Sequence, residues 1–518
     1  MKLTSISRGI SVCNHAVVNT AEMQKIEGWM FDAGIPVPAL MEKVAGRCAE
    51  RFCSDYPVDR YPKVGVLVGP GHNGGDSLVI ARELHHRGYG VQVYRPLPKA
   101  KPLTLAHASY AKSLGIPFVD ESILDSCQVI IDGLFGFGQG RLLTDELANF
   151  CDRVNQTSLP VVSIDLPSGI ATDTGEVLGT AVQATQTYCL GLWKRAFFQD
   201  PALNYLGECV LIDFDIPSAA IYTALGETPS LQTLTHSDVL QGLPLPRPPV
   251  THKYQQGSLL LICGSQRYAG SAILTALGAR ASGVGMLSIA VPESLRNLLV
   301  SQLPEALVIG CPETESGAIA NLPDLDLAKY QTIVCGPGLT PENPALVASL
   351  LTVSGSLVLD ADALNIVAAN NHLSDLKKRE NVTVLTPHLG EFKRLFPAIN
   401  PCDRIQAAQE AAEFSNCIVL LKGARTAIAS PNGSTRLIAE STPALARGGS
   451  GDVLAGLIGG LLCQPHQNSL TTVAIAAWWH AQTGRDLAQQ RTELGADAQT
   501  LAHHLLLGLA RLINADKS

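Results

Sequence analysis

Short, almost wholly apolar segments alternate with longer amphipathic stretches along most of the chain. In the first half the short segments are residues 64–68, 91–94, 129–132 and 161–165, and each is followed by a turn rich in glycine or proline. Such segments are typical of strands buried on both faces of a parallel sheet, and the amphipathic stretches are typical of the helices that cover it. The pattern predicts an α/β fold that is doubly wound and Rossmann-like in this half.

The same alternation returns in the second half of the chain. Further strands are predicted at residues 258–263, 286–291, 332–335, 357–359, 382–385 and 418–421, with a helical tail over 470–513. The join between the halves is loop-like, and its stiffest part is the proline-rich run 243–249. Because 518 residues are too many for one ordinary core, we expect two doubly wound domains, residues 1–226 and 231–518.

The composition favours a globular protein that binds small ligands. Hydrophobic residues make up 46% of the chain, the net charge is −8, and no run of Lys and Arg forms the basic stripe of a nucleic-acid surface. The 13 cysteines are irregularly spaced without a CxxC pair, as expected for reduced thiols. No signal-peptide pattern is found, and the longest apolar run, 453–463, is too short to span a bilayer. We expect a soluble, cytoplasmic homo-oligomer without membrane or nucleic-acid contacts.

A glycine-rich turn, residues 69–76, joins the first of these strands to a helix. It stands where a Rossmann fold binds phosphate, but the next strand ends in Arg95 rather than in the acid that would hold a ribose. Asn73 and Asp76 add side-chain oxygens to the turn. This combination predicts a loop for a polar ligand or a cation; the alternative is that the glycines only permit a tight turn.

Acidic residues end two more strands of the first half, at Asp132 and Asp165. Because the carboxyl ends of parallel strands line one crevice, these two side chains can converge there with Asn73 and Ser168. Oxygen ligands with few full charges suit a monovalent ion such as potassium better than magnesium. The alternative is that each Asp singly caps the helix that follows it.

The motifs PGHNGGDS, DGLFGFGQGR, IDLPSG and GLWK resemble the NAD(P)H-hydrate epimerase domain and cover nearly all of the first half. The resemblance implies that Asn73, Asp132 and Ser168 hold potassium. It also implies a site for the nucleotide hydrate made of His72, Asn73, Gly74, Gly75, Asp76, Gly136, Phe137, Gly138, Gln139, Gly140, Arg141, Leu142 and Asp165. Two positions depart from the family: His72 stands where Asn is usual, and Ser77 where Gly is often found.

Epimerisation inverts a carbon that bears a hydroxyl beside a ring nitrogen, which requires proton movement and support for charge. Asp165 is our candidate acid or base for this step. Lys194, at the end of the GLWK segment, is its candidate cationic neighbour. The alternative is that Lys194 has a purely structural role.

A second glycine loop, Gly449-Ser450-Gly451-Asp452, opens an apolar, glycine-spaced helix over residues 453–462. Amides at the start of a helix bind anions, and glycine lets a phosphate approach the backbone. A carboxylate would repel that phosphate, so we interpret Asp452 as the base that takes a proton from a hydroxyl while the amides hold the phosphoryl charge. The alternative is a first-turn acid favoured by the helix dipole, a contribution of about 0.3–1 kcal/mol.

The loop GGSGDVLAG, with DADALN and TPHLGEF, resembles the NAD(P)H-hydrate dehydratase branch of the ribokinase-like proteins. The resemblance extends from residue 252 to the C-terminus and implies a ribokinase-like fold for this half. It places the hydrate against Ala272, Gly338, His388 and Asp452, although a lone His is usually structural. It assigns adenine-nucleotide binding to Lys422, Gly423, Ala424, Arg425, Thr426 and Gly451.

Joined in this order, the halves resemble the bifunctional NAD(P)H-hydrate repair enzymes. The resemblance implies that the first domain interconverts two epimers of a nucleotide hydroxylated at C6 of the nicotinamide ring. The second domain would dehydrate the S form with ADP, giving AMP and phosphate, with magnesium expected on the diphosphate. The alternative is a ribokinase-like small-molecule kinase joined to a module that only binds nicotinamide nucleotides.

Overall fold

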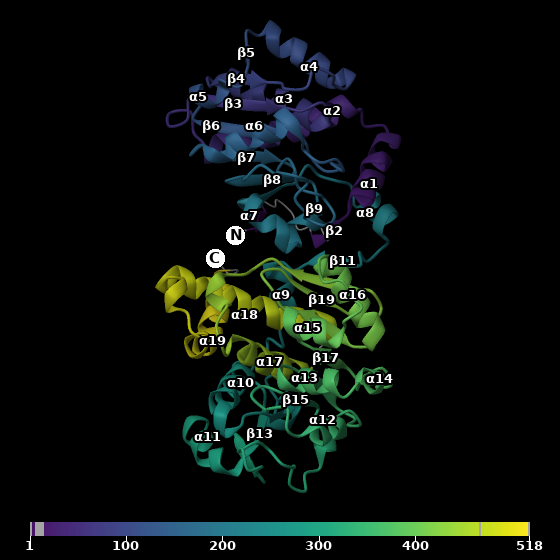
Figure 1. Ribbon diagram of the computed structural model, residues 1–518, viewed down its shortest axis with the longest axis vertical. Coiled ribbons are helices and arrows are strands. Elements are labelled where there is room, and N and C mark those ends of the chain that lie inside the picture. The colour runs from purple at the N-terminus through teal and green to yellow at the C-terminus, as the bar shows by residue number, and fades with distance from the viewer. Residues whose placement is uncertain (1–2, 6–14, 466–467, 516–518) are drawn as a thin grey trace. The chain divides into compact units, whose positions relative to one another are not determined.

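The computed structural model describes residues 3–5, 15–465 and 468–515 (Figure 1). The chain divides into two compact units, Met1–Pro229 and Ser230–Ser518. Among the described helices, none combines the length and the apolar run that a bilayer-spanning segment needs.

An eight-stranded, wholly parallel sheet forms the centre of the first unit, in the order β1-β10-β8-β7-β6-β3-β4-β5. Strands β3, β4 and β5 follow one another toward one edge of the sheet, and the next strand, β6, pairs with the other side of β3. Ligands bind at such a reversal in open α/β sheets. The strands are β1 Leu3–Ser5, β3 Lys63–Val68, β4 Gly90–Tyr94, β5 Phe118–Val119, β6 Val129–Gly133, β7 Val161–Ile164, β8 Gln186–Leu190 and β10 Glu208–Ile212.

Helices cover both faces of this sheet. This is required because successive side chains of each buried strand point to opposite faces, and both sets are apolar. In β3, Val64, Val66 and Val68 pack with one core cluster and Leu67 with another. The doubly wound prediction is therefore confirmed for this unit. Its helices are α1 Thr20–Asp32, α2 Val37–Asp55, α3 His72–His86, α4 Pro102–Ser113, α5 Ile123–Ser126, α6 Asp145–Gln156, α7 Leu203–Leu206 and α8 Ser218–Leu225, and a separate small ladder pairs β2 Val17–Val18 with β9 Trp193–Lys194.

The second unit is built on a ten-stranded sheet, in the order β11-β20-β19-β18-β17-β16-β15-β12-β13-β14. Its central strands are parallel, and β15 pairs with the side of β12 opposite to β13. Strand β19 runs antiparallel to its two neighbours, β18 and β20, which the sequence pattern did not predict. The strands are β11 Leu231–Thr233, β12 Ser258–Ile262, β13 Met286–Pro292, β14 Leu307–Cys311, β15 Thr332–Cys335, β16 Ser356–Leu359, β17 Thr383–Leu385, β18 Ile418–Leu421, β19 Thr426–Ala429 and β20 Thr435–Ile438.

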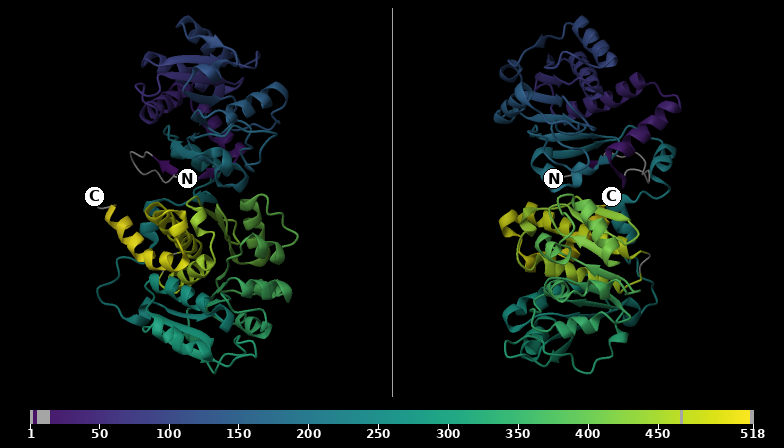
Figure 2. Two further views of the ribbon diagram at one scale, coloured as in Figure 1. Left: turned by 60° about the vertical axis from the view of Figure 1, so that its left-hand side comes forward. Right: turned by 45° about the vertical axis from the view of Figure 1, so that its right-hand side comes forward.

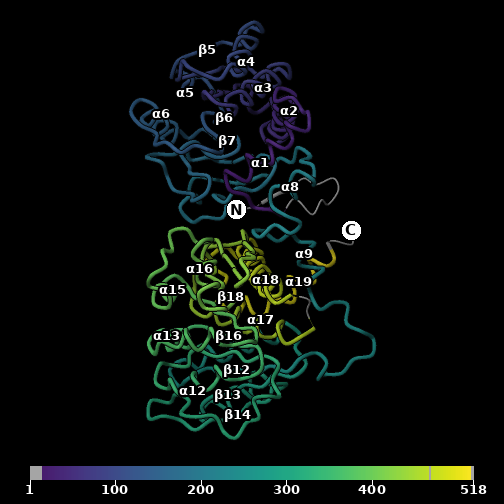
Figure 3. The backbone as a smooth tube through the Cα atoms, turned by 90° about the vertical axis from the view of Figure 1, so that its right-hand side faces the viewer, coloured from purple at the N-terminus to yellow at the C-terminus, as the bar shows by residue number. Residues whose placement is uncertain are grey.

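Helices lie on both sides of this sheet as well. Figure 3 shows the strands between α12, α13 and α15 on one side and α17 and α18 on the other, and Figure 2 gives two further views. The predicted helical tail is two helices, because the chain turns at Thr492, which has φ 66°. The helices are α9 His236–Gly242, α10 Ala269–Ala281, α11 Arg296–Gln302, α12 Pro344–Leu350, α13 Asp362–Ala369, α14 Leu373–Leu376, α15 Leu389–Leu395, α16 Arg404–Ser415, α17 Ser450–Leu462, α18 Ser469–Arg491 and α19 Ala498–Ala515.

Helices α10 and α17 approach each other closely because glycines face the neighbouring backbone. A Cβ added to Gly278 would collide with the carbonyl of Val453, and one added to Gly456 would collide with the carbonyl of Thr275. The start of α17, which carries Asp452, is therefore held at a fixed place beside the start of α10.

Candidate active sites

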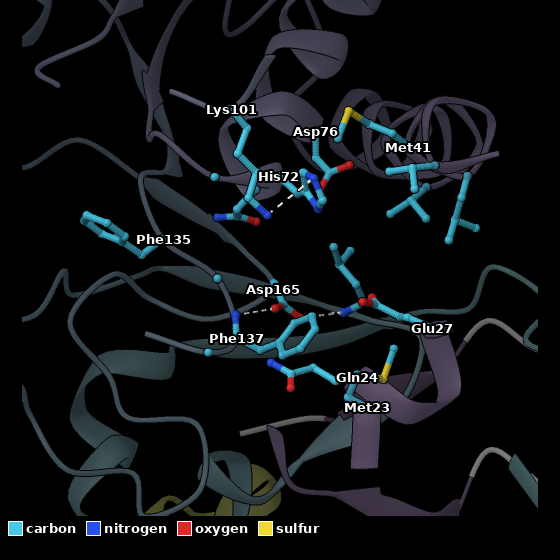
Figure 4. A pocket seen from close by; sticks show the side chains of 18 of the residues that line it. Met23, Gln24, Glu27, Met41, His72, Asp76, Lys101, Phe135, Phe137 and Asp165 are labelled. Carbon is cyan, nitrogen blue, oxygen red and sulfur yellow. Dashed lines mark hydrogen bonds between the residues drawn. The ribbon is translucent and has the colours of Figure 1, made fainter. Parts of the chain in front are cut away.

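A cavity of about 540 Å³ opens at the reversal point of the first sheet (Figure 4). The turn after β3 and the turn after β6 form one wall, and α1 and α2 form another. Apolar side chains from α1 and α2, among them Met23 and Met41, share the cavity with several charged groups. A cavity of this size, part apolar and part charged, suits the ring of a small polar ligand.

Asp165 and Lys194 form a buried ion pair at this cavity. Lys194 is fully buried, and its Nζ lies 2.6 Å from Oδ1 of Asp165 and 2.5 Å from the Leu190 carbonyl oxygen. Burial alone would lower the pKa of Lys194, but the charge and hydrogen bond of Asp165, together with Cys189 and Glu27, outweigh it and the pKa is raised. The other carboxylate oxygen of Asp165 accepts a hydrogen bond from the Phe137 amide at 2.7 Å. The structure thus brings the two candidate residues together, with Lys194 held as an ammonium ion.

Two charged residues of this cavity, Glu27 and Lys101, have no part in the sequence prediction. Burial is the main cause that raises the pKa of Glu27 to about 7. The charges of Lys194 and Lys101 lower this pKa, and the charge of Asp165 raises it. Lys101 Nζ lies 3.4 Å from Nε2 of His72, and burial together with Lys101 lowers the pKa of that imidazole. A single Glu on an amphipathic helix and a single Lys in a loop do not belong to a recognisable sequence motif. Only the fold therefore identifies them as residues of this cavity.

The predicted substrate residues separate into two groups. His72, Asn73, Asp76, Gly136, Phe137, Gly138, Gln139 and Asp165 line the cavity. Gly74 and Gly75 lie behind the wall, where a Cβ would collide with the Gly69 carbonyl or approach the Met41 side chain. The lining of this cavity does not include Gly140, Arg141 and Leu142, and the Leu142 side chain is exposed.

The candidate potassium ligands do not all stand in the cavity wall. Asp132 and Ser168 are fully buried behind it, and Asp132 accepts hydrogen bonds from the amides of Leu134 and Ser168 and the hydroxyls of Ser163 and Ser168. Burial raises the pKa of Asp132, opposed only by these hydrogen bonds. Asn73 lines the cavity, and its Nδ2 is buried without a described partner.

Asp452 lies in the first turn of α17, as the glycine loop predicted. Its pKa is raised to about 6, chiefly by burial and then by repulsion from Asp360, while a hydrogen bond from Ser271 opposes the shift. Lys422 Nζ lies 2.7 Å from Oδ1 of Asp360, which also accepts a hydrogen bond from Thr386. The loop residue Gly451 lies beside this pair, since a Cβ there would stand 3.4 Å from Lys422 Nζ. The candidate base Asp452, the Lys422 ammonium ion and the start of α17 therefore lie close together.

Other candidate residues of the second unit have structural roles in the described contacts. Nδ1 of His388 accepts hydrogen bonds from the amides of Gly390 and Glu391 and so caps α15, although 56% of the side chain is exposed. Arg425 is buried and donates to the Ala439 carbonyl oxygen at 2.8 Å.

The smaller candidate residues of this unit are tightly enclosed. Ala272 is buried in α10, and Gly338 has φ 64°, with no room for a Cβ beside Tyr268 and Ser271. Thr426 Oγ1 lies 3.4 Å from the Gly423 carbonyl oxygen, in the same turn as Ala424. Ser271 and Asp360 were missed as site residues, although Asp360 opens the DADALN motif.

Two family models match the chain. The model described as NAD(P)H-hydrate dehydratase matches residues 259–506, and the model of the YjeF-related protein N-terminus matches residues 37–196. The bifunctional NAD(P)H-hydrate repair enzyme Nnr of Synechocystis sp. is 57% identical over 95% of this chain and 94% of its own length. The enzyme of the same name from Thermosynechococcus vestitus is 55% identical over 96% of this chain and 98% of its own.

Solved structures also resemble the second part of the chain. One is an ADP/ATP-dependent NAD(P)H-hydrate dehydratase from Bacillus subtilis, co-crystallised with ATP and Mg²⁺. It is 32% identical, covers 54% of this chain and 98% of its own, and superposes with a TM-score of 0.47.

Proposed function

This chain belongs to the family of bifunctional NAD(P)H-hydrate repair enzymes, and from that premise we propose how its two units share the reaction. It is a NAD(P)H-hydrate epimerase and an ADP- or ATP-dependent NAD(P)H-hydrate dehydratase. The alternative of a small-molecule kinase is set aside, because the ribokinase-like feature describes the fold of the second unit and not its reaction. The first unit then interconverts the R and S hydrates, and the second returns the S form to NAD(P)H.

For the epimerase, we place the hydroxylated nicotinamide ring in the cavity of the first unit. The observation that supports this is the buried ion pair at the cavity, which places the Asp165 carboxylate where it can accept a proton from the substrate. Gly136 allows the substrate close to these groups, because a Cβ there would stand 3.0 Å from Asp165 Oδ2 and 3.1 Å from Asn73 Oδ1. The glycine turn before α3 offers backbone amides for the phosphates.

For the dehydratase, Asp452 takes the proton of the C6 hydroxyl as that oxygen attacks the terminal phosphoryl group of ADP. Amides at the start of α17 and the Lys422 ammonium stabilise the charge on the phosphoryl oxygens. The O–P bond forms as AMP leaves, and the C6–O bond then breaks with phosphate as the leaving group, assisted by the ring nitrogen. Magnesium is expected to arrive bound to the diphosphate, whose oxygens are the ligands that this cation prefers.

The division of labour can be tested by expressing residues 1–229 and 230–518 separately, because each is a compact unit with its own sheet. We expect the first fragment to equilibrate the two hydrate epimers without nucleotide, and the second to consume only the S epimer when ADP or ATP is present. Chromatography of the epimers over time measures both activities. If the second fragment alone clears both epimers at the rate of the intact chain, the proposed division is wrong.

We also propose that the first unit binds potassium through Asn73, Asp132 and Ser168. The donor set fits, because the Asp132 carboxylate is fully buried and no cationic side chain neutralises it among the described residues. A monovalent cation supplies that missing charge without the cost of dehydrating a divalent ion. Bound there, it would order the turns that carry Asn73 and Ser168.

In crystals grown with rubidium we expect an anomalous peak beside Asn73, Asp132 and Ser168, with the peak weakened in Asp132→Ala. Because that change also removes four hydrogen-bond acceptor contacts, Asn73→Ala is the second variant, as it leaves the Asp132 network intact. A map of the unchanged protein without a peak at these side chains would reject the assignment.

A further inference from the structure

Glu27 is a carboxyl group that the proposed mechanism leaves unused. It projects from α1 into the cavity of the first unit, and Figure 4 shows it on the same side of the cavity as Phe137 and Asp165. Its carboxyl has no hydrogen-bond or ion-pair partner in the described part of the chain. A half-buried carboxyl costs stability unless it is paired, so its presence at a substrate cavity needs an explanation.

Inversion at C6 requires two proton transfers, and the groups described so far supply only one of them. The Asp165 carboxylate, paired with Lys194, can accept a proton. Lys194 is a poor donor, because its Nζ is engaged by Asp165 and the Leu190 carbonyl and its pKa is raised. Burial and the charges of Asp165 and Glu27 hold the pKa of Asp76 well above its ordinary value. Asp76 lies beside His72, across the cavity from Asp165 (Figure 4), so the groups described so far supply no proton donor on the side of Asp165.

We propose that Glu27 is the second acid–base residue of the epimerase and that it works as a pair with Asp165. This inference rests on the proposed epimerase function of the cavity. Glu27 gives its proton to the C6 hydroxyl, the C6–O bond breaks, and its electron pair leaves with the oxygen as water. The lone pair of N1 becomes the second bond between N1 and C6. The ring stands with its C6 edge toward this side of the cavity, so that Glu27 lies at one face of C6 and Asp165 at the other. Water then adds to the face at Asp165 and gives that carboxylate a proton, and N1 recovers its lone pair.

One proton has moved from Glu27 to Asp165 in each turnover, and the reverse reaction or exchange with solvent returns it. Both directions require one proton on the pair, so epimerisation of either epimer slows when that proton is lost. The groups that face Glu27 are Asp76 on α3, Lys101 before α4, Asp165 after β7 and Lys194 on β9. Since the pKa of Glu27 is about 7, it gives up and regains a proton at neutral pH, as a general acid should.

The test is Glu27→Gln in the full chain, which keeps the size of the side chain and removes its proton. Epimerisation is measured without nucleotide, so that the second unit is idle, by following each pure epimer as it approaches equilibrium. We expect the rate to fall by about 10²–10⁴-fold. In the unchanged enzyme kcat/KM should fall as pH rises through about 7, and in the variant the residual rate should lack that fall. Glu27→Asp should restore part of the activity.

Asp32→Asn is the matched control, because it makes the same chemical change on the same helix at an exposed position outside the cavity. The ADP-dependent activity of each preparation shows whether the rest of the chain is intact, and thermal unfolding shows whether the first unit is folded. If Glu27→Gln keeps its rate within threefold of the control, or if a slowed variant retains the same fall above pH 7, Glu27 is not the acid. If the unchanged enzyme does not equilibrate the epimers at all, the proposed function of the cavity fails first.

Discussion

Asp452→Asn is expected to lower the turnover of the dehydration by about 10²–10⁴-fold, because an amide cannot take the proton of the C6 hydroxyl. The substitution keeps the size of the side chain and its ability to cap the first turn of α17. A residue that serves only the helix dipole would lose little activity when changed in this way. The variant therefore separates the two interpretations of the glycine loop.

ADP binding should survive in Asp452→Asn, or become tighter, because a negative charge beside the phosphates is removed. Calorimetry with ADP and the dehydration rate are measured on one preparation, and epimerase activity serves as the control for the folded chain. In the unchanged enzyme the rate should increase as pH rises through about 6, since the base acts only when ionised and its pKa is raised to that value. Turnover near that of the unchanged enzyme would end the catalytic interpretation of this loop.

Asp165→Asn is expected to reduce epimerisation by about 10²–10⁴-fold and also to destabilise the first unit. The variant leaves the fully buried Lys194 ammonium without the opposite charge of Asp165, so that only neutral oxygens, such as the Leu190 carbonyl, remain as its acceptors there. Breaking a buried ion pair from one side costs about 3–5 kcal/mol, because the remaining charge is uncompensated. A lower midpoint of thermal unfolding should accompany the loss of activity.

The double variant Asp165→Asn/Lys194→Met separates these two effects. Removing both charges should recover much of the stability, because no uncompensated ion is left in the interior. Epimerisation should remain lost, since the proton acceptor is still absent. A double variant that regains activity along with stability would show that Asp165 and Lys194 serve only the structure.

The fold was predictable from the sequence wherever strands are buried on both faces. The segments that became β3, β6 and β15 each have a run of apolar residues and reach a glycine at or just after their last residue, so the sequence predicts both that they are strands and roughly where they end. The antiparallel β19–β20 pair was not predicted, because its short strands follow a charged turn instead of a helix. The break at Thr492 was missed because the apolar positions continue on both sides of it.

The candidate sites were predictable only where a motif concentrates unusual residues. Asp452 and Asp165 stand out because each is a carboxyl placed where a strand or a glycine loop ends. Glu27 and Ser271 come from helix surfaces, and their role depends on which helix face the tertiary packing turns toward a site. The spacing of residues along the sequence does not show which helix face will be turned toward a site. The nucleotide-binding prediction for Arg425 stays a prediction, and its described hydrogen bond joins the residue before β19 to the Ala439 carbonyl just after β20.

The glycines within α17, two of which face α10, also determine when the dehydratase site can form. Gly451, Gly456, Gly459 and Gly460 all lie within α17. Each glycine inside a helix costs roughly 0.5–1 kcal/mol relative to alanine, so this segment has little tendency to be helical before it docks. Its helix is formed by the same contacts that complete the core of the unit. Asp452 should therefore reach its working position only at the end of folding, and a partly folded chain should present no phosphoryl-transfer site.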